Sequence, residues 1–147
     1  MAVRSDPPEV PAAFQAEWEY AARAGSTSAY SFGDDPAMLD EYAWFYGNSD
    51  GKAHAVDDKR KKPNQFSLYD MYGNVWEWVE DCYHENYNEA PKNGLAWTTG
   101  DCSQRVVRGG SWDIDPEFLR SAFRYGSSAG SRLNFLGFRV GRTLLPP

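Results

Sequence analysis

One stretch of helical periodicity stands near the start of this chain, and it constrains the fold more than any other feature. Apolar residues recur at a spacing of four, at Phe14, Trp18 and Ala22, and Gly25 follows as a helix-ending residue. This pattern predicts an amphipathic helix over residues 12–24. Because an amphipathic helix must bury its apolar face, we expect these three side chains to pack on a sheet formed by the rest of the chain.

After this helix, the apolar residues come in short runs separated by Gly, Asn and Asp. A second, shorter helix is expected over residues 36–44, where Asp35 and Pro36 form a typical helix start. The short runs predict strands at residues 75–79, 105–112, 119–125 and 137–143. The predicted fold class is therefore α+β, with one or two helices and a small, mainly antiparallel sheet in a loop-rich chain.

The size and charge of the chain limit the kinds of protein it can be. It has 147 residues, the usual size of one domain, and a net charge of −6. The basic run at residues 59–62 lies beside two aspartates and is expected to be a solvated loop, so no nucleic-acid partner is predicted. Residues 1–10 are expected to form a flexible N-terminal tail, and residues 11–147 the domain itself.

No apolar stretch of the sequence approaches the roughly 20 residues that a membrane-spanning helix needs. The N-terminus also lacks the apolar core of a signal peptide. We therefore expect no membrane span, and a cytoplasmic location by default.

The two cysteines are the residues best suited to redox or metal chemistry. Two thiols in a chain without a secretion signal are more often free than bridged, so Cys82 and Cys102 are expected to be free, with a disulfide as the alternative. The two histidines, His54 and His84, lie in polar, loop-like sequence and are expected at the surface. No group of Cys and His residues has the spacing of zinc ligands.

Four blocks of sequence, in a fixed order, carry a resemblance to a known family. The blocks are EWEYAAR at residues 17–23, FSLYDMYGNVWEW at 66–78, RVVRGGSW at 105–112 and LGFRV at 136–140. Together they resemble the formylglycine-generating-enzyme, or sulfatase-modifying-factor, domain family. The resemblance implies a variant of the C-type lectin fold, with little regular structure and long packed loops.

The chain departs from this family in two respects. The family has a sizeable portion before the first block, so a shortened domain, or a fragment with a missing N-terminal domain, is expected. The family's enzymes place two copper-binding, redox-active cysteines soon after the Gly-Gly-Ser strand, whereas residues 111–118 contain no cysteine. Because copper-dependent oxidation of a thiol needs soft thiolate ligands, we do not expect this chain to generate formylglycine.

The resemblance also implies a structural calcium site within residues 66–78. Calcium prefers oxygen ligands, and Asp70 and Glu77 would supply carboxylates while Gly73 and Val75 supply backbone carbonyls. The alternative is that Asp70 caps a turn and Glu77 pairs with an arginine.

Residues 113–135 carry large apolar side chains among Asp, Arg, Ser and Gly. One subset of the resembled family comprises the variable proteins of diversity-generating retroelements, in which adenines are randomised, mostly at Asn codons, near the C-terminus. The suspected positions within residues 113–135 all carry residues that an AAC codon altered at its adenines can encode. The predicted ligand-binding residues are Trp112, Asp113, Ile114, Asp115, Phe118, Phe123, Tyr125, Ser127, Ser131, Leu133 and Phe135.

Two interpretations of this segment stay open. Leu119, Ser121, Phe123 and Tyr125 alternate as they would on one face of a strand, so the aromatic residues could belong to the core. Alternatively, they form a binding surface, because exposed aromatic residues beside Arg and Asp are typical of protein interfaces. Exposure of the aromatic side chains distinguishes the two.

We favour a non-catalytic module that presents residues 113–135 to a protein or other macromolecular ligand on a C-type lectin-like scaffold. The alternative is a formylglycine-generating-enzyme-like oxidoreductase, or an accessory subdomain of a metal-dependent oxidase. No acid–base pair or nucleophile–base pair stands out in the sequence, which favours binding over catalysis.

Overall fold

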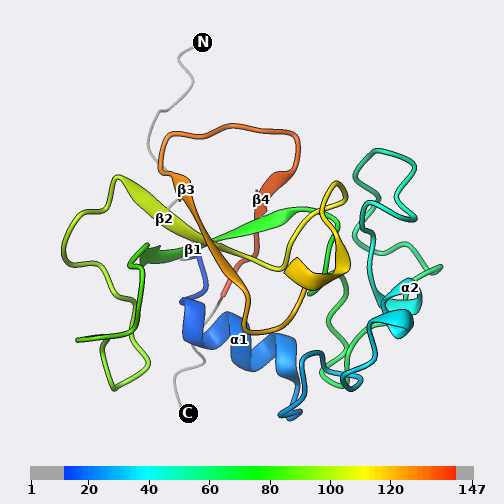
Figure 1. The fold of residues 1–147 in the computed structure, drawn as a ribbon, viewed down its shortest axis with the longest axis horizontal. Helices are drawn as coiled ribbons and strands as arrows, with labels where there is room; N and C mark the ends of the chain where they lie inside the picture. The colour runs from blue at the N-terminus through cyan, green and yellow to red at the C-terminus, as the bar shows by residue number, and fades with distance from the viewer. Residues whose placement is uncertain (1–11, 142–147) are drawn as a thin grey trace, which may run out of the picture.

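A computed structural model describes residues 12–141, so the predicted tail over residues 1–10 lies outside the described residues. Figure 1 shows one helix, α1 (Gln15–Arg23), lying along one side of a small twisted sheet, with long loops around both. The other helical segments are short: η1 (Pro36–Met38), α2 (Leu39–Tyr42) and η2 (Pro116–Phe118). Within the described part of the chain, no helix is long and apolar enough to cross a membrane.

The sheet has four strands in the order β3-β2-β1-β4. The strands are β1 (Trp76–Cys82), β2 (Gln104–Arg108), β3 (Arg124–Ser128) and β4 (Leu136–Phe138). β2 pairs antiparallel with both β1 and β3, whereas β4 pairs parallel with β1. Because β3 and β4 lie at opposite edges, the connection between them crosses from one edge of the sheet to the other (Figure 1). The predicted α+β class is confirmed, and the sheet is mixed.

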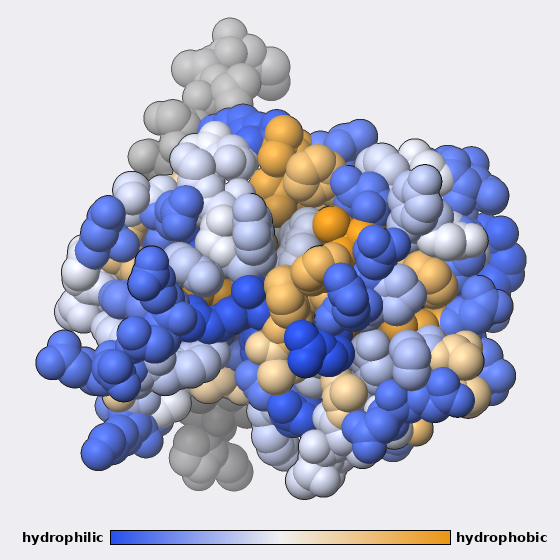
Figure 2. All heavy atoms as spheres, in the orientation of Figure 1, coloured by the Kyte–Doolittle hydropathy of each residue, from blue (hydrophilic) through white to orange (hydrophobic). Residues whose placement is uncertain are grey.

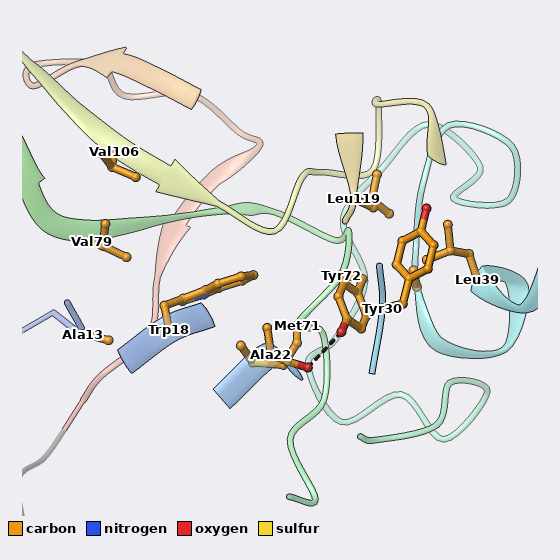
Figure 3. Close-up of a cluster of buried hydrophobic side chains, with 11 residues drawn as sticks. Ala13, Trp18, Ala22, Tyr30, Leu39, Met71, Tyr72, Val79, Val106 and Leu119 are labelled. Atoms are coloured by element: carbon orange, nitrogen blue, oxygen red, sulfur yellow. Dashed lines mark hydrogen bonds between the residues drawn. The ribbon is translucent and has the colours of Figure 1, made fainter. Parts of the chain in front are cut away.

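The helix packs on the sheet through two of the three predicted side chains, Trp18 and Ala22, whereas Phe14 is the half-buried N-cap residue and lies outside the core cluster. The helix is also shorter than the predicted 12–24. It begins where the Glu17 carboxylate accepts a hydrogen bond from the Phe14 backbone N–H at 3.1 Å, as in one half of a capping box. Trp18 is 1% exposed and, with Ala22, belongs to the cluster of buried side chains that Figure 3 shows between α1 and the strands. In the same figure the Tyr72 hydroxyl donates to the carbonyl oxygen of Ala22 at 2.8 Å, which joins the helix to the loop before β1.

An ion pair between the buried Arg108 and the partly exposed Glu19 also links α1 to the sheet. The Arg108 side chain on β2 is fully buried, and its guanidinium donates to the Glu19 carboxylate at 2.6 Å and to the Phe123 carbonyl oxygen at 2.6 Å. The guanidinium also lies 5.1 Å from the centre of the Trp18 ring. Burial lowers the pKa of Arg108, and the neighbouring Glu19 opposes that shift. Since removing one partner would leave a buried charge unpaired, this pair fixes the helix in one position.

The strand predicted over residues 119–125 is wrong in its position. Pro116 opens the short helix η2, and the Leu119 backbone N–H bonds to the Pro116 carbonyl oxygen at 3.1 Å, so the chain turns before it can pair. Pairing with β2 begins only at Arg124. The last strand also differs from the prediction over residues 137–143: β4 covers Leu136–Phe138 and does not continue through residues 139–141, while residues 142 and 143 lie outside the described residues.

The expectation of free cysteines is also wrong. Cys82 and Cys102 form a disulfide, with their Cα atoms 4.8 Å apart. Cys82 lies opposite Arg105 in the β1–β2 pair, so the chain that returns into β2 brings Cys102 beside it. The sequence separation of 20 between the cysteines conceals this proximity in the sequence. The bridge closes the loop between the two strands, which limits the unfolded chain and stabilises the fold.

The basic run at residues 59–62 is only partly the solvated loop that was expected. Lys61 is buried: its ammonium group donates to the Asp40 carbonyl oxygen at 2.6 Å and lies 4.1 Å from the centre of the Trp44 ring. Burial lowers the pKa of Lys61. His54 stacks on the same indole at 3.7 Å between ring centres, so this histidine is not the surface residue that was expected. The run therefore helps to enclose a buried tryptophan.

Candidate functional site

None of the residues predicted to bind a ligand is buried. Tyr125 and Leu133 are 57% and 48% exposed, and Asp115 is also exposed. The half-buried ones are Trp112, Asp113, Ile114, Phe118, Phe123, Ser127, Ser131 and Phe135. Ile114 packs against the core cluster, so it is partly structural. For the set as a whole, the exposure favours a surface over a core.

The aromatic side chains of this segment contact one another above β1. Trp76, which is buried, lies 6.1 Å from Phe123 and 6.1 Å from Tyr125 between ring centres. Phe118 packs edge-on against Phe123 at 5.2 Å, a favourable arrangement for two aromatic rings. We call Phe118, Phe123 and Tyr125, with Trp76 beneath them, the aromatic surface.

The side of the sheet that carries this surface is the one away from α1. In the strand register, Tyr125 lies opposite Val107, which in turn lies opposite Trp78. Side chains alternate along a strand, so these three point away from Arg108, which reaches Glu19 on α1. The aromatic surface and the helix therefore occupy opposite sides of the sheet.

Figure 2 shows the wider setting of the aromatic surface. Hydrophobic residues run through the middle of the face in view, from the β3–β4 connection toward η2, between hydrophilic flanks. Phe138 on β4, 60% exposed, lies beyond the predicted set. No local pattern of the sequence indicates the exposure of Phe138, which follows from its position on the edge strand β4. Contiguous exposed apolar residues of this kind are typical of interaction sites.

Main-chain hydrogen bonds hold the segment in place. Its anchors connect backbone atoms of the segment to backbone atoms elsewhere in the chain. They are Trp112 N–H to Asn74 O at 2.9 Å, Tyr46 N–H to Ile114 O at 3.1 Å, Ser121 N–H to Ala29 O at 2.8 Å and Trp76 N–H to Phe135 O at 2.8 Å. Because backbone groups make these bonds, they do not depend on which side chains the segment carries.

The glycine that leads from β2 into the segment is required by close packing. Gly110 has a φ of +75°, and a Cβ atom there would lie 3.0 Å from the Leu119 side chain. Only glycine adopts this backbone conformation without strain, so the turn and the buried Leu119 position the start of the segment together.

The predicted calcium ligand Glu77 is held by other side chains. Its Oε2 accepts from Trp18 Nε1 at 2.6 Å and from Arg139 Nε at 3.0 Å, and its Oε1 accepts from Arg139 Nη2 at 2.8 Å. This is the arginine pair that the alternative interpretation named. The donor set as it lies here does not fit calcium, because a guanidinium already neutralises Glu77. Calcium binding therefore stays a prediction. For Glu77 to bind the ion, the Arg139 guanidinium would have to move away from the Glu77 carboxylate.

The other predicted ligands have separate surroundings. Asp70 is buried, its Oδ2 has no hydrogen-bond partner, and burial raises its pKa to about 7, against Arg139 and a hydrogen bond from Asn74. Gly73 passes so close to the Trp44 carbonyl oxygen that a Cβ atom would lie 2.1 Å from it, and Val75 is half-buried. Across residues 12–141, no three His, Cys, Asp or Glu side chains converge as a metal site would require.

The cysteines and one histidine do come together, at the end of β1. The His84 ring stacks on Trp97 at 3.6 Å, and its nitrogens lie 3.1 Å from the carbonyl oxygens of Cys82 and Thr99. A pocket of about 180 Å³ between α1 and this loop is lined by Trp97 but by neither cysteine of the disulfide. The two thiols therefore form a cross-link, which leaves neither as a thiolate while it is intact.

These features define an α+β domain in which one side of a small mixed sheet is covered by a helix and the other carries an anchored, half-exposed segment. The sequence matches the Sulfatase-modifying factor enzyme 1-like domain over residues 12–144, and the chain belongs to this family. The family and the fold of formylglycine-generating-enzyme type, both expected from the four sequence blocks, are confirmed.

Three similar proteins carry three different names. The chain is 33% identical over 144 residues to the formylglycine-generating enzyme of Mycobacterium tuberculosis, a match that covers 85% of this chain and 48% of the relative. It is similar to the structure of Treponema denticola variable protein 1, with a TM-score of 0.77 and 37% identity over 86% of this chain and 45% of that one. It is also similar to PvdO from Pseudomonas aeruginosa, with a TM-score of 0.78 and 39% identity over 86% and 50% of the two chains. The chain thus spans about half the length of each.

Proposed function

We propose that this chain is a non-catalytic ligand-binding module that presents residues 113–135 to a protein or other macromolecular ligand. The observation that carries the proposal is the way the segment is held. Its anchors are main-chain hydrogen bonds, while the side chains predicted to bind are half-buried or exposed. A segment of this kind can change its half-buried and exposed side chains and keep its backbone in place, while the buried Leu119 and Ser121 stay constant; a binding surface on a rigid scaffold requires this.

The likeness to Treponema denticola variable protein 1, at 37% identity, supports a further step. We propose that residues 113–135 are diversified, as in the variable proteins of diversity-generating retroelements. A gene for a reverse transcriptase and a near-copy of the sequence encoding residues 113–135 would then lie beside the gene for this chain. Sequencing that neighbourhood tests the step, and the absence of both would reject it without affecting the binding proposal.

An oxidoreductase is the competing function, because the chain is 33% identical to a formylglycine-generating enzyme. Copper-dependent thiol oxidation needs thiolate ligands. The sequence contains two cysteines, and they are joined to each other. We prefer the binding proposal because it accounts for the main-chain anchors and the half-buried or exposed side chains of residues 113–135.

Replacing Phe118, Tyr125 and Phe135 together with Asn tests the binding proposal. If the three side chains serve a surface, we expect the variant to fold and each change to cost about 1 kcal/mol or less in the free energy of unfolding. The matched control is Leu119→Asn, in the same segment but fully buried, which should cost several times as much because it places an unpaired amide in the core. Urea denaturation followed by tryptophan fluorescence measures both. A triple variant that does not fold would remove the proposal.

A further inference from the structure

An open groove of about 550 Å³ lies beside η2, between residues 29–36 and residues 115–120. It shares η2 with the aromatic surface: Phe118 packs on Phe123, whereas Pro116 and Glu117 line the groove. Four of the eight residues that line the groove belong to residues 113–135. The aromatic surface and the groove therefore adjoin at η2.

The apolar wall of the groove is fixed by its contacts. The Tyr30 hydroxyl donates to the Pro116 carbonyl oxygen at 3.0 Å, which ties the two sides of the groove together. The Tyr30 ring also stacks on Phe32 at 5.1 Å between ring centres. Tyr30 is itself only 3% exposed, so the apolar surface open to a ligand comes from Ala29, Pro36 and Pro116 on the same lining.

The rim of the groove is acidic. Asp34, Asp115 and Glu117 are exposed, and Arg120 is the one cation among the lining residues, so the lining carries three negative charges and one positive charge. No Lys, Arg or His nitrogen within residues 12–141 lies within 4.0 Å of any of the three carboxylates. The Arg120 Nε instead donates to the Glu117 backbone carbonyl oxygen at 3.0 Å. Asp34 Oδ1 accepts a hydrogen bond from the Ala29 backbone N–H at 2.8 Å. Its other oxygen and the carboxylates of Asp115 and Glu117 are therefore the groups available to a cation from outside the described chain.

We propose that this groove receives the basic side chains of a protein partner, so that the ligand of residues 113–135 is a protein with an arginine- or lysine-rich segment. The proposal rests on the proposed function, because the aromatic surface would hold the apolar residues of the same partner. Arginine suits the groove best: its planar guanidinium can lie against Pro36 and Pro116 and bond to two carboxylates at once. Complementary charge at such a rim also speeds association and selects among partners.

A fluorescein-labelled hexa-arginine peptide is the probe, and fluorescence anisotropy at low salt is the measurement. The groove variant combines Asp34→Asn, Asp115→Asn and Glu117→Gln. The control variant combines Asp50→Asn, Asp57→Asn and Glu85→Gln, all exposed and outside the groove, so that both variants lose the same net charge. We expect the groove variant to bind the peptide about tenfold more weakly than the wild type, and the control about as well as the wild type. A hexa-glutamate peptide should not bind to any of the three proteins.

Two outcomes would overturn the proposal. If both variants lose affinity equally, the peptide responds only to the net charge of the domain. If the wild type does not bind the peptide at low salt, the groove does not receive basic side chains. Neither outcome depends on whether the Phe118, Tyr125 and Phe135 variant folds, so failure of the groove and failure of the proposed function can be told apart.

Discussion

The two sides of the sheet use large side chains in opposite ways. On the α1 side, Trp18 is 1% exposed and its neighbours Val79 and Val106 are buried. On the other side, the rings of Phe123 and Tyr125 pack on Trp76 and still remain in contact with solvent. The residue types are similar, so hydrophobicity alone does not separate them. What separates them is the covering layer: a helix fixed by an ion pair on one side, and a loop segment held by its backbone on the other.

The largest loss of stability should come from a substitution on the side of the sheet that α1 covers. Trp18→Ala is expected to cost about 3–5 kcal/mol in the free energy of unfolding, because it leaves a cavity and removes the indole donor of Glu77. Tyr20→Ala is the control, since Tyr20 lies on the same helix but is exposed. It should cost no more than about 0.5 kcal/mol. Equal losses in urea denaturation would mean that α1 does not cover a core.

The next effect concerns the disulfide, which stabilises the scaffold and not the aromatic surface. Reduction should lower the stability by about 3 kcal/mol, as expected for a loop of this length. Thermal melts with and without reductant measure it. A Cys82→Ser and Cys102→Ser double variant should match the reduced protein and should not respond to reductant. A wild-type Tm that is insensitive to reductant would show that the bridge contributes nothing.

A smaller, pH-dependent effect should come from Asp70. Burial raises its pKa from 3.8 to about 7, so the folded state holds a proton that the unfolded state releases. This contribution to stability is fully present below pH 3.8 and is lost as the pH rises through about 7. Relative to the wild type, the Asp70→Asn variant should therefore gain stability between pH 5 and pH 8. Denaturation of both proteins at pH 5 and at pH 8, in the presence of a calcium chelator, measures the difference in their free energies of unfolding. A difference that is the same at both pH values would contradict the raised pKa of Asp70.

Calcium can be tested on the same residues. If Asp70, Gly73, Val75 and Glu77 bind calcium, the ion must raise the Tm, because a ligand that binds only the folded state stabilises it by mass action. Glu77→Gln should abolish the rise. Identical midpoints in calcium and in chelator would reject the site and leave the ion pair with Arg139 as the role of Glu77.

The smallest loss of stability should come from a substitution on the side of the sheet that carries the aromatic surface. Tyr125→Asn is expected to change the free energy of unfolding by about 0.5 kcal/mol or less. Its partner across the strands, Val107, is buried, so Val107→Asn should cost several kcal/mol. Comparable losses at the two positions would remove the contrast between the sides of the sheet.

The sequence predicted what depends on local pattern and on recognisable blocks. The spacing of Trp18 and Ala22 was enough for α1, because one amphipathic helix needs only a partner layer, although Phe14 proved to be its N-cap residue and not part of the buried face. The pattern at residues 119–125 misled, because alternation looks the same whether the chain pairs or turns after a proline. The family blocks supplied the fold that composition alone could not.

The features that the sequence did not predict all join distant parts of the chain. The disulfide depends on the register of β1 and β2, and the exposure of Tyr125 depends on which side of the sheet α1 covers. The groove brings residues 29–36 against residues 115–120. No local sequence pattern encodes such long-range contacts, since they form only when the chain has folded.

The parallel pairing of β4 with β1 has a consequence for synthesis. β1 receives its second neighbour only when residues 136–138 are available, and the ion pair between Glu77 and Arg139 spans 62 residues. On the ribosome, helix α1 and the β1–β2–β3 portion emerge first, with one edge of the central strand still unpaired. An unpaired strand edge readily captures other chains. A nascent domain of this kind is therefore most exposed to aggregation just before its last strand is released.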